Sequence, residues 1–187
     1  MEKIITDRVH EAIIFAAAAH SGQKRKATDL PYIIHPMEVL QILCEMDAGE
    51  DLKIAGLLHD TLEDTETTPE QIEKQFGKRV LELVQSNSEN KELSWQERKQ
   101  HTIDLLCKID DIEIKMLILA DKLANLKSML SDYEVMGEEL WERFNAPKDK
   151  QAWYYKGIIE SLESMEDMPN CRYNYQKIKS VYKQIFK

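Results

Sequence analysis

The sequence predicts an all-α fold, and three observations carry this prediction. Few segments alternate polar and apolar residues with a period of two, as half-buried strands do. Segments rich in Val, Ile and Thr and bounded by turn residues are also missing. Two capping boxes, Thr68-Pro69-Glu70-Gln71 and Ser94-Trp95-Gln96-Glu97, mark the starts of helices. We therefore expect helices along nearly the whole chain.

The helices expected in the first half of the chain follow from their end signals. Thr6 is a candidate N-cap for the first helix, and Pro36 is tolerated in the first turn of the second. Gly77 is expected to separate two further helices. The polar stretches 21–30 and 85–92 are expected to be loops. The predicted helices cover about 7–20, from 35 onward, 51–63, from the first capping box to Gly77, and from 78 onward.

The second half of the chain is expected to continue the same pattern. The predicted helices cover about 94–109, 111–130, 148–164 and 173–186. A length of 187 residues fits one domain. The 6 glycines and 5 prolines are too few and too scattered to mark a linker. We therefore expect a single domain over residues 1–187.

Charge and cysteine content exclude several functional classes. The net charge of −9 disfavours a nucleic-acid partner, because a long polyanion would be repelled. The longest uncharged apolar run, Ala12–Ala19, is too short to span a membrane. Three widely separated cysteines do not form a disulfide framework, so a cytoplasmic location is the expectation. A small phosphorylated partner remains compatible with the locally basic segment Lys24-Arg25-Lys26.

The dipeptide His59-Asp60 ends an apolar stretch and is followed by two more carboxylates. Glu63 lies four residues after His59, and Asp64 lies four residues after Asp60. On a helix these pairs share neighbouring faces. Carboxylates held close together repel one another unless a cation or protons intervene. The sequence therefore predicts a divalent metal at this turn.

His35 and Asp121 are the candidates for the remaining metal ligands. Asp121 interrupts the apolar run Met116–Ala120, where a carboxylate needs a cation or strong donors. Alone, it could equally be a salt-bridged buried residue. Two imidazoles and two carboxylates, from His35, His59, Asp60 and Asp121, form a mixed nitrogen and oxygen site. Such a site suits Mn, Fe(II), Zn or Co and leaves positions open for water.

Four longer motifs surround these residues. They are Gly22-Gln23-Lys24-Arg25-Lys26, Pro31-Tyr32-Ile33-Ile34-His35-Pro36, Leu57-Leu58-His59-Asp60-Thr61-Leu62-Glu63-Asp64-Thr65, and Leu119-Ala120-Asp121-Lys122-Leu123-Ala124-Asn125-Leu126. In this order they resemble the hydrolase domain of the Rel/SpoT family, within the HD phosphohydrolase superfamily. The resemblance covers about residues 7 to 130 in order and spacing. Lys122 and Ala124 stand where that family usually has arginine and histidine.

The resemblance implies an HD-domain helical bundle that removes the 3′-pyrophosphate from the alarmone ppGpp with Mn²⁺. Glu63 and Asp64 would position the attacking water and move its proton. Arg25 and Lys26 would neutralise the charge on the pyrophosphate. The nucleotide would contact a second group of residues on the helix of Asp121. These residues are Lys122, Asn125 and Ser128.

Two other functional classes stay open at this point. An HD enzyme could act on a nucleoside monophosphate or on another 3′-phosphorylated nucleotide, and it would need no basic cluster. A metal-binding or nucleotide-sensing domain without turnover is the second alternative. Glu63 and Asp64 argue against it, because extra carboxylates beside an anionic ligand do not help a pure binder.

Overall fold

Helices make up the regular structure of the described residues, as the sequence predicts. The structure is a computed structural model that describes residues 7–26, 28–87 and 92–186. In these ranges no β-strand is present, and only an isolated bridge joins Lys24 to Pro31. The prediction of an all-α fold is confirmed. None of the helices in these ranges is both long and apolar enough to cross a membrane.

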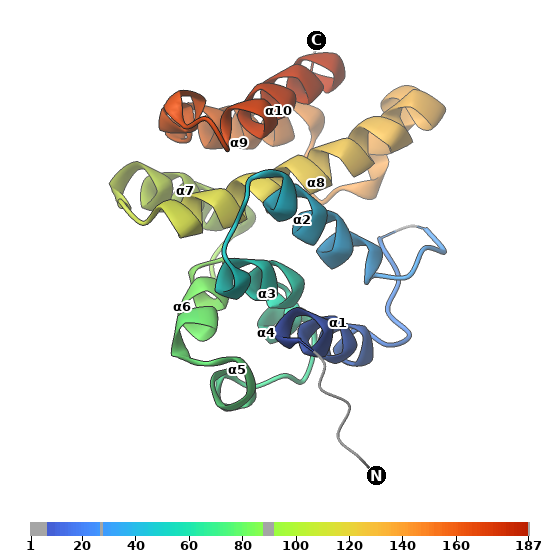
Figure 1. Cartoon of the computed structure of the whole chain (residues 1–187). Coiled ribbons are helices and arrows are strands. Elements are labelled where there is room, and N and C mark those ends of the chain that lie inside the picture. Colours follow the sequence, from blue (N-terminus) through green and yellow to red (C-terminus); the bar gives the residue numbers. More distant parts are fainter. Residues whose placement is uncertain (1–6, 27, 88–91, 187) are drawn as a thin grey trace. The chain divides into compact units, whose positions relative to one another are not determined.

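The chain divides into two compact units, Met1–Ser88 and Glu89–Lys187, which we call the N-terminal and C-terminal units. The expected single domain over residues 1–187 stays a prediction. The N-terminal unit contains α1 (Arg8–Ala19), α2 (Ile34–Glu45), α3 (Glu50–Leu58), α4 (Thr61–Asp64), α5 (Pro69–Phe76) and α6 (Lys78–Ser86) (Figure 1). The C-terminal unit contains α7 (Trp95–Lys108), α8 (Ile112–Met136), η1 (Gly137–Arg143), α9 (Lys148–Ser161), η2 (Glu163–Asp167) and α10 (Arg172–Ile185), where η marks a 3₁₀-helix.

Both capping boxes form at the helix starts where the sequence places them. The Thr68 hydroxyl accepts from the backbone N–H of Gln71, whose side chain accepts in return from Thr68 N–H. Ser94 and Glu97 make the same reciprocal pair at the start of α7. Each box satisfies two backbone donors that have no partner inside the helix. Gly77 then ends α5 with a φ of 95°, a left-handed conformation that favours glycine.

The core of the N-terminal unit is organised around α3, which contacts α1, α2 and α6 (Figure 1). A helix with neighbours on several sides must be apolar around most of its circumference. At Gly56 the approach of α2 is so close that an added Cβ would collide with Leu43. The buried residues of α3 are Leu52, Ile54, Ala55, Gly56, Leu57 and Leu58.

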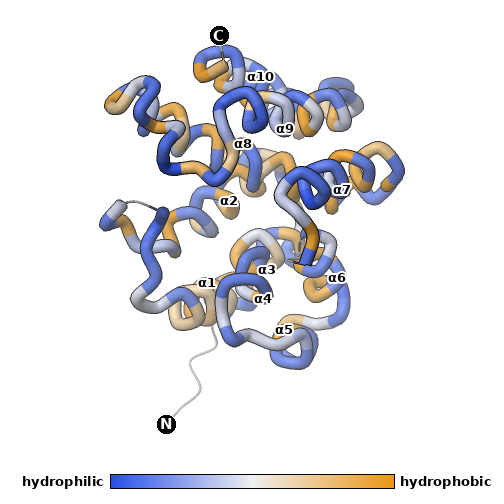
Figure 2. Tube along the Cα trace, turned by 180° about the vertical axis from the view of Figure 1, so that it is seen from behind, coloured by the Kyte–Doolittle hydropathy of each residue, from blue (hydrophilic) through white to orange (hydrophobic). Residues whose placement is uncertain are grey.

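The C-terminal unit is built on α8, which contacts α10 and η1. A second pair, α7 and α9, approaches closely at Gly157, where an added Cβ would lie 2.5 Å from Ile103 Cδ1. The α5 and α10 helices are amphipathic, and in Figure 2 hydrophilic and hydrophobic stretches follow one another along them. Such faces bury apolar side chains and leave charged ones in water.

Several expected boundaries need correction. The helix expected over 51–63 breaks at His59 and Asp60, so that α3 and α4 are separate. The N-cap of α1 is Asp7, whose carboxylate accepts from His10 N–H; the expected cap, Thr6, lies outside the described residues. The α8 helix continues to Met136. The short helices η1 and η2 were not expected, and of the expected loop 85–92 residues 88–91 lie outside the described ranges.

Candidate metal centre

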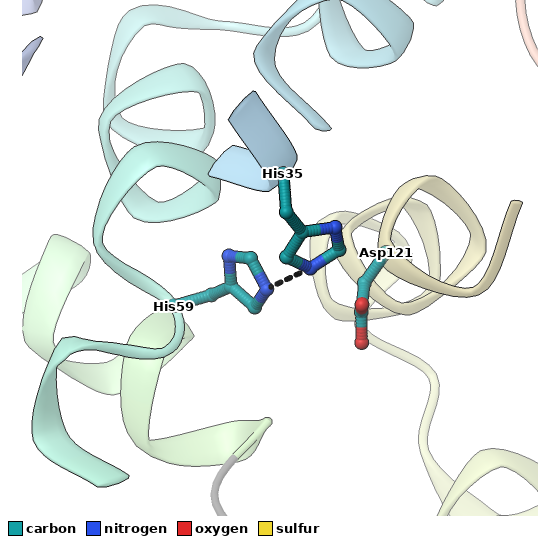
Figure 3. A group of neighbouring side chains, drawn as sticks. All are labelled: His35, His59 and Asp121. Atoms are coloured by element: carbon teal, nitrogen blue, oxygen red, sulfur yellow. Dashed lines mark hydrogen bonds between the residues drawn. The ribbon is translucent and has the colours of Figure 1, made fainter. Parts of the chain in front are cut away.

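Two buried histidines of the N-terminal unit face each other through their ring nitrogens. His35 is the second residue of α2, and His59 is the C-cap of α3. Their Nε2 atoms lie 3.1 Å apart (Figure 3). The two residues are only 2% and 0% exposed. The packing of α2 on α3 therefore brings together two imidazoles that lie 24 residues apart in the chain.

The backbone of α3 fixes the orientation of the His59 ring. His59 Nδ1 lies 2.8 Å from the carbonyl oxygen of Gly56. A carbonyl oxygen only accepts hydrogen bonds, so Nδ1 is the donor and Nε2 is the ring atom left to bind a metal. A histidine that binds a metal through one ring nitrogen commonly donates such a hydrogen bond from the other.

Asp60 adds a carboxylate to the two imidazoles. Its Oδ2 lies 3.1 Å from His59 Nε2 and 3.5 Å from His35 Nε2. Adjacent residues of a regular helix point in directions about 100° apart. At the break between α3 and α4, however, the side chains of His59 and Asp60 point to the same place. The HD dipeptide thus lies between two helices and presents two potential ligand atoms at one place.

These three atoms fit a divalent metal. Two ligand atoms that each lie about 2.1 Å from one ion are about 3.0 to 3.4 Å apart when the angle between the bonds is about 90 to 110°. The separations among His35 Nε2, His59 Nε2 and Asp60 Oδ2 are 3.1, 3.1 and 3.5 Å. The donor set of imidazole and carboxylate suits divalent transition metals.

Tyr32 connects Asp60 with the basic segment of the preceding loop. Its hydroxyl donates to Asp60 Oδ2 at 2.6 Å, and Asp64 Oδ2 lies 3.4 Å away. Burial, together with the negative charge of Asp60, raises the pKa of Tyr32, so the hydroxyl remains a donor at neutral pH. The guanidinium carbon of Arg25 lies 5.7 Å from the centroid of the Tyr32 ring. Arg25 therefore contacts the ring of Tyr32, the same residue whose hydroxyl binds Asp60.

Asp121 occupies the C-terminal unit on α8, where it is only 3% exposed. Its two carboxylate oxygens accept from Lys122 Nζ and from Asn125 Nδ2, each at 2.6 Å. Burial lowers the pKa of Lys122, but the charge of Asp121, the hydrogen bond to Asp121 and the neighbouring Tyr154 and Tyr155 together outweigh this effect and raise the pKa well above its usual value. Lys122 is therefore charged at neutral pH, and Asn125 does share the face of Asp121, as its spacing predicts.

The other predicted site residues lie on three different elements. Glu63 and Asp64 belong to α4, where Glu63 is half-buried and Asp64 is exposed. Their backbone N–H groups donate to the carbonyl oxygen of Asp60 at 3.2 and 3.0 Å. Lys26 is exposed in the loop before α2, and Ser128 is half-buried on α8.

Comparison with known proteins places the chain in a family. Residues 12–140 match the family described as HD domain. This chain belongs to the HD-domain family. The matched range includes His35, His59, Asp60 and Asp121, which are the residues that the order H…HD…D selects.

Curated relatives resemble this HD domain over part of their length. A guanosine-3′,5′-bis(diphosphate) 3′-pyrophosphohydrolase of Aquifex aeolicus is 38% identical over 125 residues, which are 66% of this chain and 18% of the relative. The bifunctional (p)ppGpp synthase/hydrolase SpoT of Escherichia coli K12 is 35% identical over 127 residues, again 18% of its length. The HD-domain chain thus spans about a fifth of these relatives.

Two solved structures match this HD domain over most of both chains. The crystal structure of lmo0812 from Listeria monocytogenes is 40% identical, with a TM-score of 0.74, and the match covers 83% of this chain and 96% of the other. A metazoan ortholog of SpoT, described as hydrolysing ppGpp with a role in starvation responses, is 28% identical with a TM-score of 0.77. That match covers 97% of both chains.

Sequence reasoning missed several residues around the site of this HD domain. Tyr32 belongs to the motif that contains His35, but its spacing in the sequence did not predict a hydrogen bond to Asp60. In the C-terminal unit, Lys99 Nζ and Lys122 Nζ lie 4.9 and 6.0 Å from the centroid of the Tyr154 ring. Two cations from α7 and α8 thus approach one aromatic ring of α9, which a linear pattern cannot reveal.

Proposed function

We propose that this HD-domain protein is a metal-dependent phosphohydrolase that removes the 3′-pyrophosphate from ppGpp. The observation that carries the proposal is the meeting of His35 Nε2, His59 Nε2 and Asp60 Oδ2 within 3.5 Å of one another. Arg25 lies beside this cluster on the Tyr32 ring and supplies positive charge for a phosphate. The names of the relatives from Aquifex aeolicus and Escherichia coli support ppGpp as the substrate.

We propose Mn²⁺ as the metal and Asp121 as its fourth protein ligand. Imidazole ligands favour Mn²⁺ over Mg²⁺, which prefers a shell of oxygens. Asp121 is the carboxylate that the order of the motifs assigns to this role. Protein treated with a chelator should regain activity with Mn²⁺ and much less with Mg²⁺. Full activity in the presence of chelator would contradict a metal-dependent reaction.

The proposed reaction adds water to the phosphorus atom that is bonded to the 3′-oxygen of the ribose. The bond from this phosphorus to the 3′-oxygen breaks, so the products are GDP and pyrophosphate. A bound divalent ion supplies Lewis acidity to the water and the phosphate. The carboxylates of Glu63 and Asp64 take a proton from the water and return one to the 3′-oxygen. Their position one turn after Asp60 supports these roles.

Two groups of positive and polar side chains contact the substrate in this proposal. In the N-terminal unit, Arg25 and Lys26 neutralise the charge of the pyrophosphate. In the C-terminal unit, Lys122, Asn125 and Ser128 contact the nucleotide. The bonds of Lys122 and Asn125 to Asp121 support a shared face. Such charge stabilisation is worth most where the pyrophosphate leaves the ribose, because its charge grows there.

The decisive experiment incubates the Mn²⁺-loaded protein with ppGpp, GMP and a 3′-phosphorylated nucleotide. The expected products from ppGpp are GDP and pyrophosphate, and in isotopically labelled water the label enters the pyrophosphate. Asp60→Ala, which lacks a metal ligand, is the inactive control. Efficient release of orthophosphate from the other two nucleotides without turnover of ppGpp would overturn the substrate assignment. Metal binding without any turnover would point to a sensor instead.

A further inference from the structure

His20 is a buried histidine whose contacts lead to the metal centre from two directions. It is the C-cap of α1 and only 3% exposed. Its ring lies on that of Tyr32, with centroids 4.7 Å apart and planes inclined by 30°. Its Nδ1 lies 2.8 Å from Gln23 Oε1. His20 belongs to none of the four sequence motifs.

The first path runs through the ring of Tyr32 to Asp60. The Tyr32 hydroxyl donates to Asp60 Oδ2 at 2.6 Å. A phenol can hold a carboxylate in place only if its own ring is fixed, and the His20 ring is one surface that fixes it. His20 thereby acts on the orientation of Asp60 without touching it.

The second path runs through Gln23 to the backbone of α4. Gln23 Nε2 donates to the carbonyl oxygen of Asp64 at 2.6 Å, while the backbone carbonyl of Gln23 accepts from Tyr32 N–H at 2.9 Å. Gly22, with a φ of 78°, lets the chain turn from α1 toward these partners. Gln23 therefore joins the end of α1 to both Tyr32 and Asp64.

The other ring nitrogen of His20 makes a purely structural role unfavourable. Among the described residues, the buried Nε2 of His20 has no hydrogen-bond partner. Burying such a group costs about 1–3 kcal/mol, a cost that an apolar side chain of similar shape avoids. For stability alone, phenylalanine would serve at least as well on the Tyr32 ring. What an imidazole adds, and a phenyl ring lacks, is the hydrogen bond from Nδ1 to the Gln23 side chain.

We propose that His20 is a positioning residue that, through Tyr32 and Gln23, fixes the metal ligand Asp60 and the segment of Asp64. This inference rests on the proposed metal site. His20 touches neither the metal nor the substrate, so its effect appears in metal affinity and in turnover. A positioning role predicts that a change at His20 leaves the stability of the fold unchanged. A packing role predicts a loss of stability instead.

A double-mutant cycle with Mn²⁺ affinity as the readout tests the path through Tyr32. His20→Leu removes the ring, and we expect Mn²⁺ to bind about tenfold more weakly, the lower end of the range for groups that orient metal ligands. In the Tyr32→Phe background, where the hydroxyl is already absent, the same change should weaken binding by less than about threefold. His10→Leu is the matched control on the exposed side of α1. An equal loss in both backgrounds, or unchanged affinity in His20→Leu, would overturn the inference.

His20→Phe tests the path through Gln23 and also serves if His20→Leu does not fold. This variant keeps an aromatic ring on Tyr32 and loses the bond to Gln23. We expect an unchanged or higher melting temperature, Mn²⁺ affinity within about threefold, and a kcat for ppGpp that falls by about tenfold. A lower melting temperature with an unchanged kcat would assign His20 to packing alone. If the wild type does not cleave ppGpp, the proposed function fails, whereas the Mn²⁺ cycle still decides the role of His20.

Discussion

The imidazole of His59 is held by the carbonyl oxygen of Gly56, which lies 2.8 Å from His59 Nδ1. Both residues belong to the same turn at the end of α3. The bond directs the His59 Nε2 lone pair to the point that His35 and Asp60 share. Gly56 also lies where an added Cβ would collide with Leu43 of α2. Gly56 therefore serves both the packing of the core, through its missing Cβ, and the orientation of His59, through its carbonyl oxygen.

Gly56→Ala should destabilise the protein although alanine favours helices. The better helix propensity contributes about 1 kcal/mol, but the new methyl group collides with the fully buried Leu43, and overpacking costs about 1–3 kcal/mol. We expect a net loss of about 1 kcal/mol in urea denaturation. Leu43→Val makes room, so the double variant should lose less than the sum of the single variants. Strict additivity would show that the two side chains do not interact.

His59→Ala should lose Mn²⁺ binding while the fold persists. The variant removes one ligand atom and leaves Asp60 beside a single imidazole. Titration calorimetry should show at least about a tenfold loss of Mn²⁺ affinity. His101→Ala, an exposed histidine on α7, is the control and should bind as the wild type does. Equal affinity in both variants would refute the assignment of His59.

Arg25→Ala should lower kcat/KM for ppGpp by about 10- to 1000-fold, the range for losing one charge-stabilising donor. Lys24→Ala is a matched control one residue away. The Lys24 ammonium lies 2.6 Å from Asp29 Oδ1, so its charge is already paired in an exposed bridge. We expect less than about a threefold effect from Lys24→Ala. Equal losses in the two variants would indicate that only the overall charge of the loop matters.

The pH dependence of unfolding should reveal the ion pair between Glu166 and Lys179. The hydrogen bond from Lys179, with a second from Gln176, lowers the pKa of Glu166. The folded state therefore gains stability above the unfolded pKa of about 4.3, and this gain is lost as the pH falls through the lowered pKa. The difference in urea midpoint between wild type and Glu166→Gln should shrink over that acidic range. Glu163→Gln is the exposed control on η2, and a pH-independent difference would contradict the linkage.

Local sequence signals predicted helix starts better than the geometry of the site. The box from Thr68 to Gln71 could be read because all its hydrogen bonds join residues within one turn. The break at His59 and Asp60 could not, because the apolar pattern continues into the dipeptide. The sequence nevertheless selected His35, His59 and Asp60, which the structure brings together, and their role as ligands stays a prediction.

Contacts between residues far apart in the chain could not be predicted from the sequence, and the reason is physical. The bond from Tyr32 to Asp60 joins residues 28 positions apart, and the path through His20 needs the turn after α1. Periodicity identifies which face of a helix is buried, but it does not give the partner of that face. The length of α8 was also underestimated, since the helix continues to Met136 and not only to residue 130.

The bond between His59 and Gly56 makes the end of α3 intolerant of changes in chain length. Each residue added to or removed from a helix rotates the later residues by about 100°. A single insertion between Gly56 and His59 would therefore turn the imidazole away from its carbonyl and from His35. Protein engineers who need to lengthen this unit therefore have no room in the three residues before the HD dipeptide.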